Sequence, residues 1–413
     1  MDRDPSHNID DGYDLHGNTP YGDAGLRPAK RHLHPPSPPS PSWGGMDTAQ
    51  GGGDFLRNTC GVWTMKIVVH ESITAGGLSG SRVAPTLLAE GRMMLEALLT
   101  DLYDLEEHQL SVQVDRRYLP QLPARPGLQV VDSRNSYYQC FAQMVKEADA
   151  VFLIAPETGG LLEAITGMVE TCGKLVLGCS TAGIKAAGDK TLTYRLLKAH
   201  GIPTPRTLHL RPADDPASVD RELGCPVVVK PIDGVGCHSV FVARRQSELE
   251  RTIAAARQEA QNATLLVQTY IDGVAVSVSL LTDGSRSLPL TLNLQDIRGR
   301  NRLRYHGGSV PFDHPLRALA FRRAEEVVLA IPGLKGYVGI DLVLTDHDAV
   351  VIDVNPRLTT SYVGTRKVLR QNLAALILDA VAGKLPDPTA IHIVGSARFT
   401  TRSCDVRALE SRQ

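Results

Sequence analysis

Aromatic side chains and surplus charge are both scarce in this chain of 413 residues. Aromatic residues make up 5% of the sequence, and both tryptophans, Trp43 and Trp63, precede Met65. The 44 lysine and arginine residues almost balance the 45 aspartate and glutamate residues, which leaves a formal net charge of −1. Because nucleic acids and anionic membranes attract strongly basic surfaces, this balance argues against either of them as the main partner.

Long apolar runs, metal-binding motifs and secretion signals are also missing. No stretch has the unbroken apolar length of a transmembrane helix, and the first residues lack the basic and apolar regions of a secretory signal. The seven cysteines are odd in number and show no zinc-ligand spacing, and the 13 histidines form no HExxH motif. We therefore expect a cytoplasmic protein with reduced, buried cysteines. The length allows two or three domains.

Residues 1–64 differ in composition from the rest of the chain. They are rich in Pro, Gly, Asp and Ser, and they lack the periodic apolar residues that build a core. Met65 then opens the run MKIVVH, which is typical of a strand. We therefore expect residues 1–64 to be either a disordered leader or a segment placed before the natural start at Met65.

Between residues 65 and 185 the pattern alternates between strands and helices. Such alternation predicts an α/β domain in which helices cover both faces of a parallel sheet. The predicted strands are Lys66–His70, Ala150–Ala155 and Lys174–Gly178, and the predicted helices are Pro85–Leu102 and Leu161–Cys172. Ligands of such sheets bind beyond the carboxyl ends of the strands. Glu71, Ser72, Glu157 and Thr158 follow strand ends, so we expect them to hold a substrate amine or carboxylate. Loop and helix-capping roles are equally compatible.

A glycine-rich turn follows a buried strand that ends in Lys230. The turn contains Asp233, Gly234 and Gly236, and a second apolar run begins at Val240. Glycines allow backbone N–H groups to approach phosphate oxygens, and a lysine adds positive charge. The segment therefore indicates a phosphate site, with an ordinary hairpin as the alternative.

Two acidic strands lie further along the chain, within 337–344 and 349–362, and residues 345–348 form the predicted turn between them. Period-two geometry places Asp353 and Asn355 on one face, and Asp341 can lie opposite them. Two carboxylates and an amide oxygen suit Mg²⁺, with Mn²⁺ as a substitute. Arg357 follows as a contact for a phosphate or acyl oxygen. A structural salt bridge between Asp353 and Arg357 is the alternative.

His306 precedes Gly307 and Gly308 in the segment NRLRYHGGSVPFDHP. We expect a flexible loop here, in which His306 could orient or deprotonate an attacking amine. A solvated histidine without a role is the alternative. Beyond this segment, the pattern predicts helices at 314–330 and 372–382.

The order of these parts resembles the ATP-grasp superfamily. The order runs from Lys190 through Lys230, the glycine turn and the QTYIDG segment to Asp341, Asp353 and Asn355, and the resemblance covers roughly residues 65–385. Within the superfamily, the segments MKIVVHESITAGG, LIAPETGGLLE and DVNPRLTTSYVG are similar to the tyramine–glutamate ligase group of methanofuran biosynthesis.

The resemblance implies a fold and a set of ATP-binding residues. The fold is an α/β chain with a Rossmann-like pre-ATP-grasp domain at 65–185, a small lobe at 186–269, a large lobe at 270–390 and a tail at 391–413. Lys190 and Lys230 would hold the ATP phosphates, the glycine turn would cover them, and the carboxylates would hold the metal. Gln268, Tyr270 and Ile271 would form the adenine-binding hinge. The segment 274–276 departs from the pattern, because it carries Val-Ala-Val where many members have the glutamate that binds ribose.

The resemblance also implies a reaction. An ATP-dependent carboxylate–amine ligase forms an acyl phosphate and then an amide, and in the narrower group the substrates are glutamate and tyramine. The cofactors are ATP and Mg²⁺, and the partners are a small-molecule carboxylate and amine. A phosphotransferase and a non-catalytic nucleotide sensor remain as alternatives, and a homodimer is the commonest default assembly.

Overall fold

The computed structural model describes residues 64–77, 84–118, 128–132, 137–232, 239–261, 263–400 and 404–407. The expectations for residues 1–63 and for the glycine turn with Asp233, Gly234 and Gly236 lie outside the described residues. No helix in the described ranges is long and apolar enough to cross a membrane. The four cysteines whose side chains are described are free, but only Cys179 is buried, whereas Cys172 is exposed.

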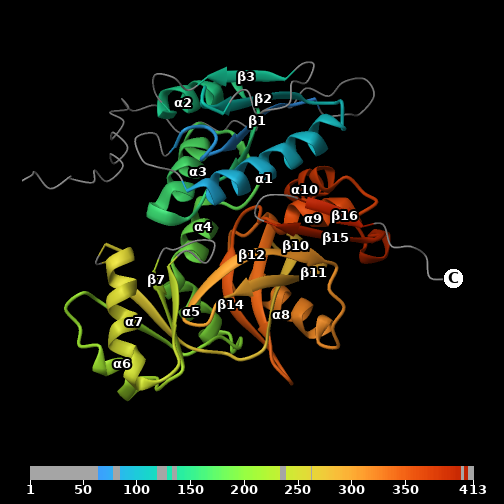
Figure 1. Ribbon diagram of the computed structural model, residues 1–413. Helices are drawn as coiled ribbons and strands as arrows, with labels where there is room; N and C mark the ends of the chain where they lie inside the picture. Colours follow the sequence, from blue (N-terminus) through green and yellow to red (C-terminus); the bar gives the residue numbers. More distant parts are fainter. Residues whose placement is uncertain are drawn as a thin grey trace, which may run out of the picture. The chain divides into compact units, whose positions relative to one another are not determined.

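The N-terminal sheet is entirely parallel, as predicted, and its strands follow the order β3-β2-β1-β4-β5. Figure 1 labels its strands β1, β2 and β3. Its strands are β1 (Lys66–Glu71), β2 (Gln109–Val114), β3 (Gln129–Asp132), β4 (Ala150–Ile154) and β5 (Leu175–Val176). The helices around it are α1 (Pro85–Tyr103), α2 (Tyr137–Glu147) and α3 (Leu161–Thr171). Strand β5 is shorter than the predicted 174–178.

Alternation along β1 explains why helices cover both faces of this sheet. Ile67 and Val69 belong to the core that includes Leu95 and Leu98 of α1. Val68, between them, belongs to the core formed with residues of α2 and α3. Because successive side chains of a strand point to opposite faces, a strand that is apolar throughout must be covered on both sides.

Two short helices connect the parallel sheet to the rest of the chain. They are α4 (Thr181–Gly188) and α5 (Lys190–Ala199), and Asp189 lies between them. The Asp189 carboxylate accepts hydrogen bonds from the backbone N–H groups of Thr191 (2.8 Å) and Leu192 (3.1 Å). This cap fixes the start of α5, and it therefore fixes Lys190 at the first helical position.

The remaining strands form one large sheet, in which β14-β13-β10-β11-β12-β8-β7-β9-β6 is the order and β15 and β16 branch from β12. The first strands are β6 (Thr207–Leu210), β7 (Val227–Pro231), β8 (Val240–Ala243), β9 (Leu265–Thr269) and β10 (Val274–Thr282). The later strands are β11 (Ser287–Arg298), β12 (Arg302–Val310), β13 (Gly336–Leu344), β14 (Ala349–Asn355), β15 (Ser396–Thr400) and β16 (Cys404–Arg407). The two expected lobes thus share a continuous path of strands, because β12 pairs with β8.

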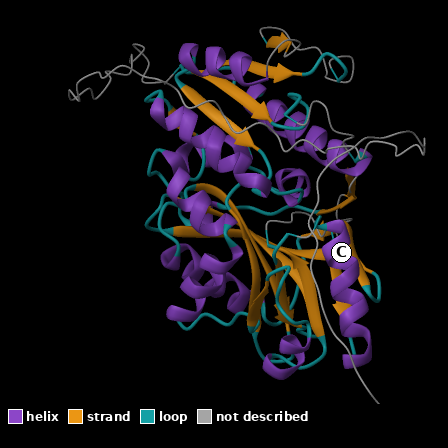
Figure 2. Ribbon diagram, turned by 90° about the vertical axis from the view of Figure 1, so that its left-hand side faces the viewer, coloured by secondary structure: helices purple, strands orange, loops and turns teal. Residues whose placement is uncertain are grey.

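Helices cover this sheet on different faces (Figure 2). They are α6 (Ala217–Glu222), α7 (Gln246–Glu259), α8 (Arg317–Ala330), α9 (Ser361–Val368) and α10 (Leu373–Val381), with short 3₁₀ turns at Thr158–Gly160 and Pro388–Ala390. Along β10, Val276 and Val278 share a core with the apolar face of α8. Ser279, on the opposite face, hydrogen-bonds to Tyr337 and lies 3.3 Å from the Ser361 hydroxyl of α9.

The C-terminal segment contributes more than the expected polar tail. Strand β15 pairs with β12, and Ala397 and Phe399 are each only 2% exposed. Phe399 packs against α9, because a side-chain carbon at Gly364 would lie 2.7 Å from its ring. The sequence did not indicate this strand, because it alternates apolar with polar residues and is too short to stand out from the composition of the tail.

Candidate active site

A cavity of about 470 Å³ brings together most of the predicted site residues. Its wall includes the ends of β1 and β4, one side of α1, the start of α5, and strands from both parts of the large sheet. The predicted residues that line it are Glu71, Glu157, Lys190, Lys230, Gln268, Tyr270, Ile271, Asp341, Asp353, Asn355 and Arg357. Its volume lies in the usual range for sites that bind small molecules.

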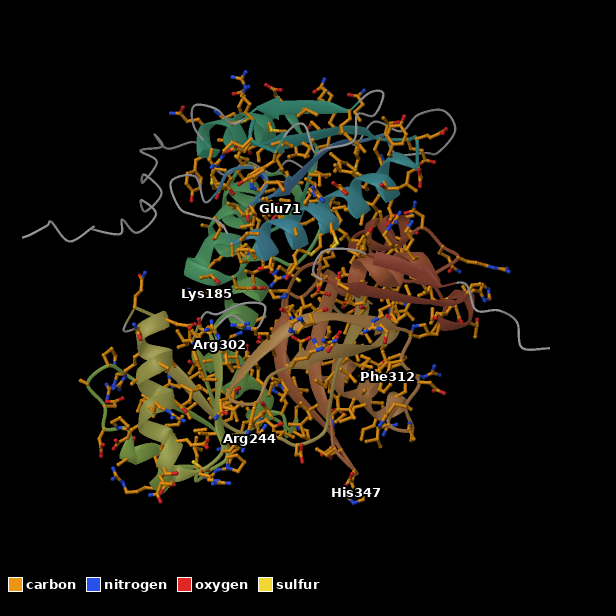
Figure 3. The ribbon with its side chains drawn as sticks, viewed as in Figure 1. Glu71, Lys185, Arg244, Arg302, Phe312 and His347 are labelled. Atoms are coloured by element: carbon orange, nitrogen blue, oxygen red, sulfur yellow. The ribbon has the colours of Figure 1, made fainter. Side chains whose placement is uncertain are left out.

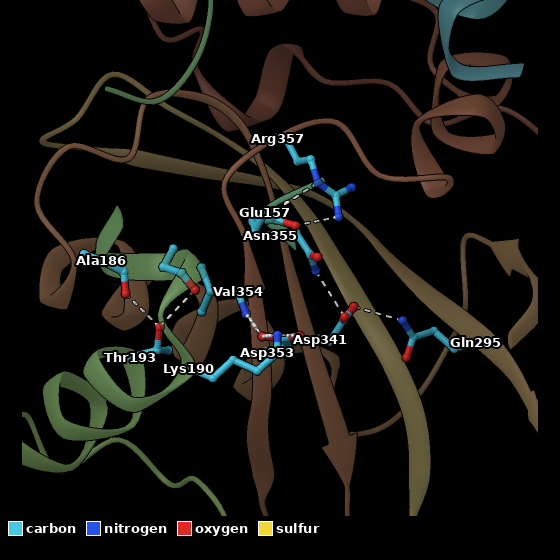
Figure 4. Close-up of polar contacts among 11 residues, drawn as sticks. Glu157, Ala186, Lys190, Thr193, Gln295, Asp341, Asp353, Val354, Asn355 and Arg357 are labelled. Carbon is cyan, nitrogen blue, oxygen red and sulfur yellow. Dashed lines mark hydrogen bonds and ion pairs between the residues drawn. The ribbon is translucent and has the colours of Figure 1, made fainter. Parts of the chain in front are cut away.

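The hairpin of β13 and β14 places the acidic residues together, as period-two geometry predicts. Asp341 pairs in register with Asp353, and Gly339 pairs with Asn355. The amide Nδ2 of Asn355 donates a hydrogen bond to Asp341 Oδ2 at 3.1 Å, and Gln295 Nε2 of β11 donates to Asp341 Oδ1 at 2.9 Å (Figure 4). The two carboxylates therefore lie side by side on the floor of the cavity.

Lys190 is the cation that holds Asp353. Its ammonium group lies 2.6 Å from Asp353 Oδ2 and 2.9 Å from Oδ1, across 163 positions of sequence (Figure 4). Burial alone would raise the pKa of Asp353, but the charges of Lys190 and Lys230 hold it below its ordinary value. The alternative salt bridge between Asp353 and Arg357 does not form, because Arg357 binds another partner.

Asp341 differs from its neighbour in its electrostatics. Burial and the adjacent charge of Asp353 raise the pKa of Asp341 to about 6, although Asn355 and Gln295 oppose the shift. Like charges in a shared site favour protonation of one carboxylate unless a cation is present. This pair therefore has an unmet demand for positive charge beyond that of Lys190.

The donor set fits a hard divalent cation that is completed by other ligands. Carboxylate and amide oxygens are the ligands Mg²⁺ takes, and this ion usually keeps water and substrate phosphate in its shell. No group of three or more His, Cys, Asp or Glu that could hold a metal occurs in the part of the chain described. Asp341, Asp353 and Asn355 would therefore supply only part of a coordination shell.

Lys230 and the residues predicted to form the hinge also line the cavity. Lys230 is 8% exposed near the end of β7, and its charge acts on Asp353. Gln268 is buried on β9 and donates a hydrogen bond to Thr207 Oγ1 at 3.0 Å, so its side chain supports the strand pair. The ring of Tyr270 lies under the guanidinium of Arg244, whose Cζ is 5.1 Å from the ring centre. Tyr270 also lines the cavity.

Arg357 makes a two-point ion pair with Glu157. Its Nε and Nη2 atoms lie 2.9 and 3.0 Å from the two oxygens of Glu157, 200 positions away in sequence (Figure 4). Both side chains are mostly buried, with 13% and 10% of their surface exposed. Both were predicted as substrate contacts on different grounds. The structure instead pairs them with each other at the cavity wall, where they join the end of β4 to the turn after β14.

Of the other residues predicted at strand ends, Glu71 lines the cavity, whereas Ser72 and Thr158 do not. The Glu71 carboxylate is buried and accepts hydrogen bonds from Ile73 N (3.1 Å), Thr74 N (2.7 Å) and Thr74 Oγ1 (2.7 Å). These contacts are those of a residue that caps a loop, which was the alternative role predicted for Glu71. Figure 3 shows its position at the end of β1. Ser72 is buried outside the cavity lining, and Thr158 is exposed in a 3₁₀ turn outside it.

The prediction of a flexible loop at His306 is wrong. His306 lies within β12, which pairs with β11 on one side and with β15 on the other. Leu303 and Tyr305 line the cavity, whereas His306 is exposed outside the lining and near Asp296. Because neighbouring residues of a strand point to opposite faces, His306 points away from Tyr305 and from the cavity.

Sequence reasoning missed several residues of the cavity wall, including Glu90 and Gln295. Gln295 lies two strands from Asp341, and no spacing in the sequence indicates that contact. Glu90 did carry a signal: it lies four positions before Met94 and eight before Leu98, which are both buried. A carboxylate on the apolar stripe of an amphipathic helix indicates a buried or functional position.

Comparisons with known families agree with this architecture. Residues 187–361 match the family model of the ATP-grasp domain, and residues 108–184 match that of the pre ATP-grasp 3 domain. The chain therefore contains a pre-ATP-grasp domain followed by an ATP-grasp domain. This confirms the expected fold class, in which a parallel-sheet domain precedes an α+β ATP-grasp domain.

Individual proteins and one solved structure are also similar to this chain. The chain is 28% identical to the tyramine–L-glutamate ligase of Methanocaldococcus fervens over 296 residues, which are 71% of this chain and 87% of that protein. It is also 28% identical to the enzyme of the same name from Methanocaldococcus jannaschii, over 76% of this chain and 88% of that one. A crystal structure described as an ATP-grasp superfamily protein from Archaeoglobus fulgidus is 24% identical, with a TM-score of 0.59, over 81% of this chain and 92% of that one.

Proposed function

We propose that this protein is an ATP-dependent carboxylate–amine ligase that forms its amide through an acyl phosphate. The observation that carries the proposal is the convergence of Lys190 and Lys230 on Asp341 and Asp353 within one cavity, next to the hinge at 268–271. Two relatives named tyramine–L-glutamate ligase support a C–N bond-forming reaction of this kind.

The chemistry follows from the poor leaving group of a free carboxylate. An amine cannot readily displace oxide from carbon, whereas it can displace phosphate. Transfer of the γ-phosphoryl group of ATP to a carboxylate oxygen yields ADP and an acyl phosphate. The amine then forms the new C–N bond as the C–O bond to phosphate breaks, and the amine loses a proton. Both steps require stabilisation of negative charge on phosphoryl oxygens.

Named residues would supply that stabilisation. Lys190 and Lys230 are the ammonium groups of the cavity, and both lie close enough to Asp353 to lower its pKa. Asp341, Asp353 and Asn355 would hold Mg²⁺, or Mn²⁺ in its place, and the bound ion would neutralise charge on the phosphates. The proposed lobes at 186–269 and 270–390 would enclose the nucleotide between them, and closure of the site would exclude water from the acyl phosphate.

The names of the relatives suggest which carboxylate and which amine to test. Glutamate as the acyl donor and tyramine as the amine are the first pair to test, because the relatives carry both in their names. A screen of amino acids against primary amines, read by ATP-dependent phosphate release and by mass spectrometry of the products, tests the proposal directly. An amide product with ADP and phosphate supports it. A stable phosphorylated product would instead identify a phosphotransferase, and binding of ATP without turnover would identify a sensor.

A variant of the proposed metal site tests whether Asp353 is needed for ligation. Asp353→Ala removes a metal ligand and the partner of Lys190, and we expect loss of ligation by at least about 100-fold, as for removal of a transition-state charge contact. Asp346→Ala is the matched control, because Asp346 is exposed in the turn of the same hairpin. Ligation by Asp353→Ala at the level of the control would refute the assignment of the metal site.

A further inference from the structure

The carboxylates of the cavity are unequally supplied with hydrogen-bond donors. Four of the five acidic side chains that line it have donors within the protein. Glu71 accepts from the turn at residues 73–74, Glu157 from Arg357, Asp341 from Gln295 and Asn355, and Asp353 from Lys190. Each of these four carboxylates therefore has hydrogen-bond donors without any substrate.

Glu90 is the fifth, and it has no such donor among the residues that the structure describes. It lies on the second turn of α1 and lines the cavity, and its carboxylate makes no hydrogen bond or ion pair with the described residues. Burial raises the pKa of Glu90 to about 7, and the charge of Arg357 only partly offsets that effect. Glu90 is half-buried, so its carboxylate is only partly hydrated, and a charge there is costly without a partner among the described residues. A cationic ligand would remove that cost.

The surroundings of Glu90 are apolar. Leu87 and Met94 lie three positions before it and four after it on α1, so they flank it on the same face of the helix, and both line the cavity. Ile73 and Ile154 contribute further apolar surface to the lining, from the turn after β1 and from the end of β4. This compartment therefore offers one anionic acceptor between apolar walls.

We propose that Glu90 and its apolar neighbours Leu87, Met94, Ile73 and Ile154 bind the amine substrate, as a primary ammonium group attached to an apolar or aryl body. The inference rests on the proposed ligase function and deepens it by naming the amine site. An ammonium group supplies the donors that Glu90 lacks, and the aliphatic side chains bury the attached carbon skeleton.

The position of this compartment suits an attacking amine. The charge of Arg357 lowers the pKa of Glu90, and the charges of Asp341 and Asp353 raise the pKa of Arg357. Arg357 therefore lies within electrostatic reach of Glu90 and of the two aspartates. An amine bound at Glu90 thus approaches from the α1 side a carbonyl carbon that is activated beside the aspartates. A carboxylate at the same place would be repelled by ionised Glu90, and a metal ion would find a single carboxylate ligand there.

The test uses the full-length protein with a matched pair of variants. Glu90→Gln keeps the size of the side chain and removes its charge, and Glu96→Gln is the control, since Glu96 lies on α1 outside the cavity lining. We expect Glu90→Gln to raise the KM of the amine by about 10- to 100-fold, the range for one lost hydrogen bond to a charged group. The KM of ATP should stay within about twofold, as such a binding defect leaves the nucleotide end intact.

A second readout comes from the pH dependence of kcat/KM for the amine. The charged groups that line the cavity with Glu90 on this side are Glu71 of β1, Glu157 beyond β4 and Arg357 beyond β14. Because Glu90 must be ionised to bind an ammonium group, kcat/KM in the wild type should fall as the pH drops below about 7. Glu90→Gln should lack this decrease, whereas a merely structural Glu90 would leave the profile unchanged in shape.

The size of the apolar compartment is tested with an amine series. In the wild type, kcat/KM should rise from ethylamine to 2-phenylethylamine, and Leu87→Asn should reduce that preference. An unchanged amine KM in Glu90→Gln overturns the proposal, and so does a rise confined to the KM of the amino acid, which would place Glu90 at the acyl donor. The proposed function fails separately, if the wild type forms no amide with any pair in the screen.

Discussion

Replacing Lys190 by methionine removes the ammonium group that donates two hydrogen bonds to Asp353 and keeps most of the apolar stem. The change leaves Asp353 and Asp341 in register on adjacent strands with less positive charge beside them. We expect the variant to be less stable than the wild type in metal-free buffer. Asp353 would then depend for charge compensation on Lys230 and Arg357, on protonation or on an added cation.

The magnitude follows from the burial of the pair. Removing one partner of a fully buried ion pair costs about 3–5 kcal/mol, because the other charge stays buried without compensation. The side chains of Lys190 and Asp353 are 12% and 23% exposed, so water reaches the carboxylate in part. A value at or just below the lower end of that range, about 2–3 kcal/mol, is therefore expected. In a chain of this length, each kcal/mol lowers Tm by roughly 1–2 °C, which gives a decrease of about 2–6 °C.

The assay is thermal unfolding of both proteins with a chelator and with saturating magnesium. Because a divalent cation at Asp341 and Asp353 would replace the missing positive charge, the difference in Tm should shrink when magnesium is present. Lys185→Met on α4 is the control, since Lys185 is exposed (Figure 3) and its loss should change stability by less than about 0.5 kcal/mol. An equal loss with and without magnesium would contradict the role of Lys190 as a counter-ion, and so would no loss at all.

Two further predictions concern the N-terminal sheet. Gly91→Ala places a methyl group 2.7–2.8 Å from the Glu71 carboxylate, so it should destabilise the protein by about 1–3 kcal/mol in urea unfolding. Gly167→Ala, whose nearest neighbour would lie at 3.7 Å, should be neutral or stabilising, and equal effects would refute the clash. Burial lowers the pKa of His70 to about 3, so below pH 6.5 the unfolded chain binds a proton that the folded chain does not, and stability is lost as the pH falls. The slope, about 1.4 kcal/mol per pH unit between about 6 and 3, should be absent in His70→Gln; the same slope in both proteins would contradict it.

The hairpin of the candidate site could be predicted because its geometry is local. Asp341 and Asp353 are only 12 positions apart, and a short turn fixes which residues face each other. Period-two alternation then determines that Asn355 lies on the same face as Asp353. The apolar strands and amphipathic helices of the parallel sheet were predictable for the same reason, since each is defined by neighbours within its own segment.

The ion pairs that complete the site could not be predicted in this way. Lys190 and Asp353 are 163 positions apart, and Glu157 and Arg357 are 200 apart. Which cation meets which carboxylate depends on how α5, β4 and β14 pack, and no sequence spacing encodes that arrangement. A bridge between Asp353 and Arg357, which are close in the chain, was the alternative that the sequence left open, and the structure gives each of them a different partner.

The error at His306 shows how glycine can mislead. Adjacent glycines suggest a flexible loop, but Gly307 and Gly308 lie in a paired strand. A side-chain carbon at Gly307 would lie 2.1 Å from the carbonyl oxygen of Phe399, and one at Gly308 would lie 2.3 Å from that of Leu294. These glycines permit close approach of β15 and β11 to β12. Such a requirement is visible only once the neighbouring strands are known.

The pairing of charges in the cavity has a consequence for what it can bind. Within the protein, Lys190 is matched to Asp353 and Arg357 to Glu157, so withdrawal of one member leaves its partner uncompensated. A nucleotide without metal would draw Lys190 toward phosphate and leave Asp353 beside Asp341. A metal ion alone would take the carboxylates and leave Lys190 without an acceptor. The complex of both brings phosphate oxygens for the lysine and positive charge for the aspartates, so every charge keeps a partner. We therefore predict that the site favours the metal–nucleotide complex over either component, because its own residues already neutralise one another.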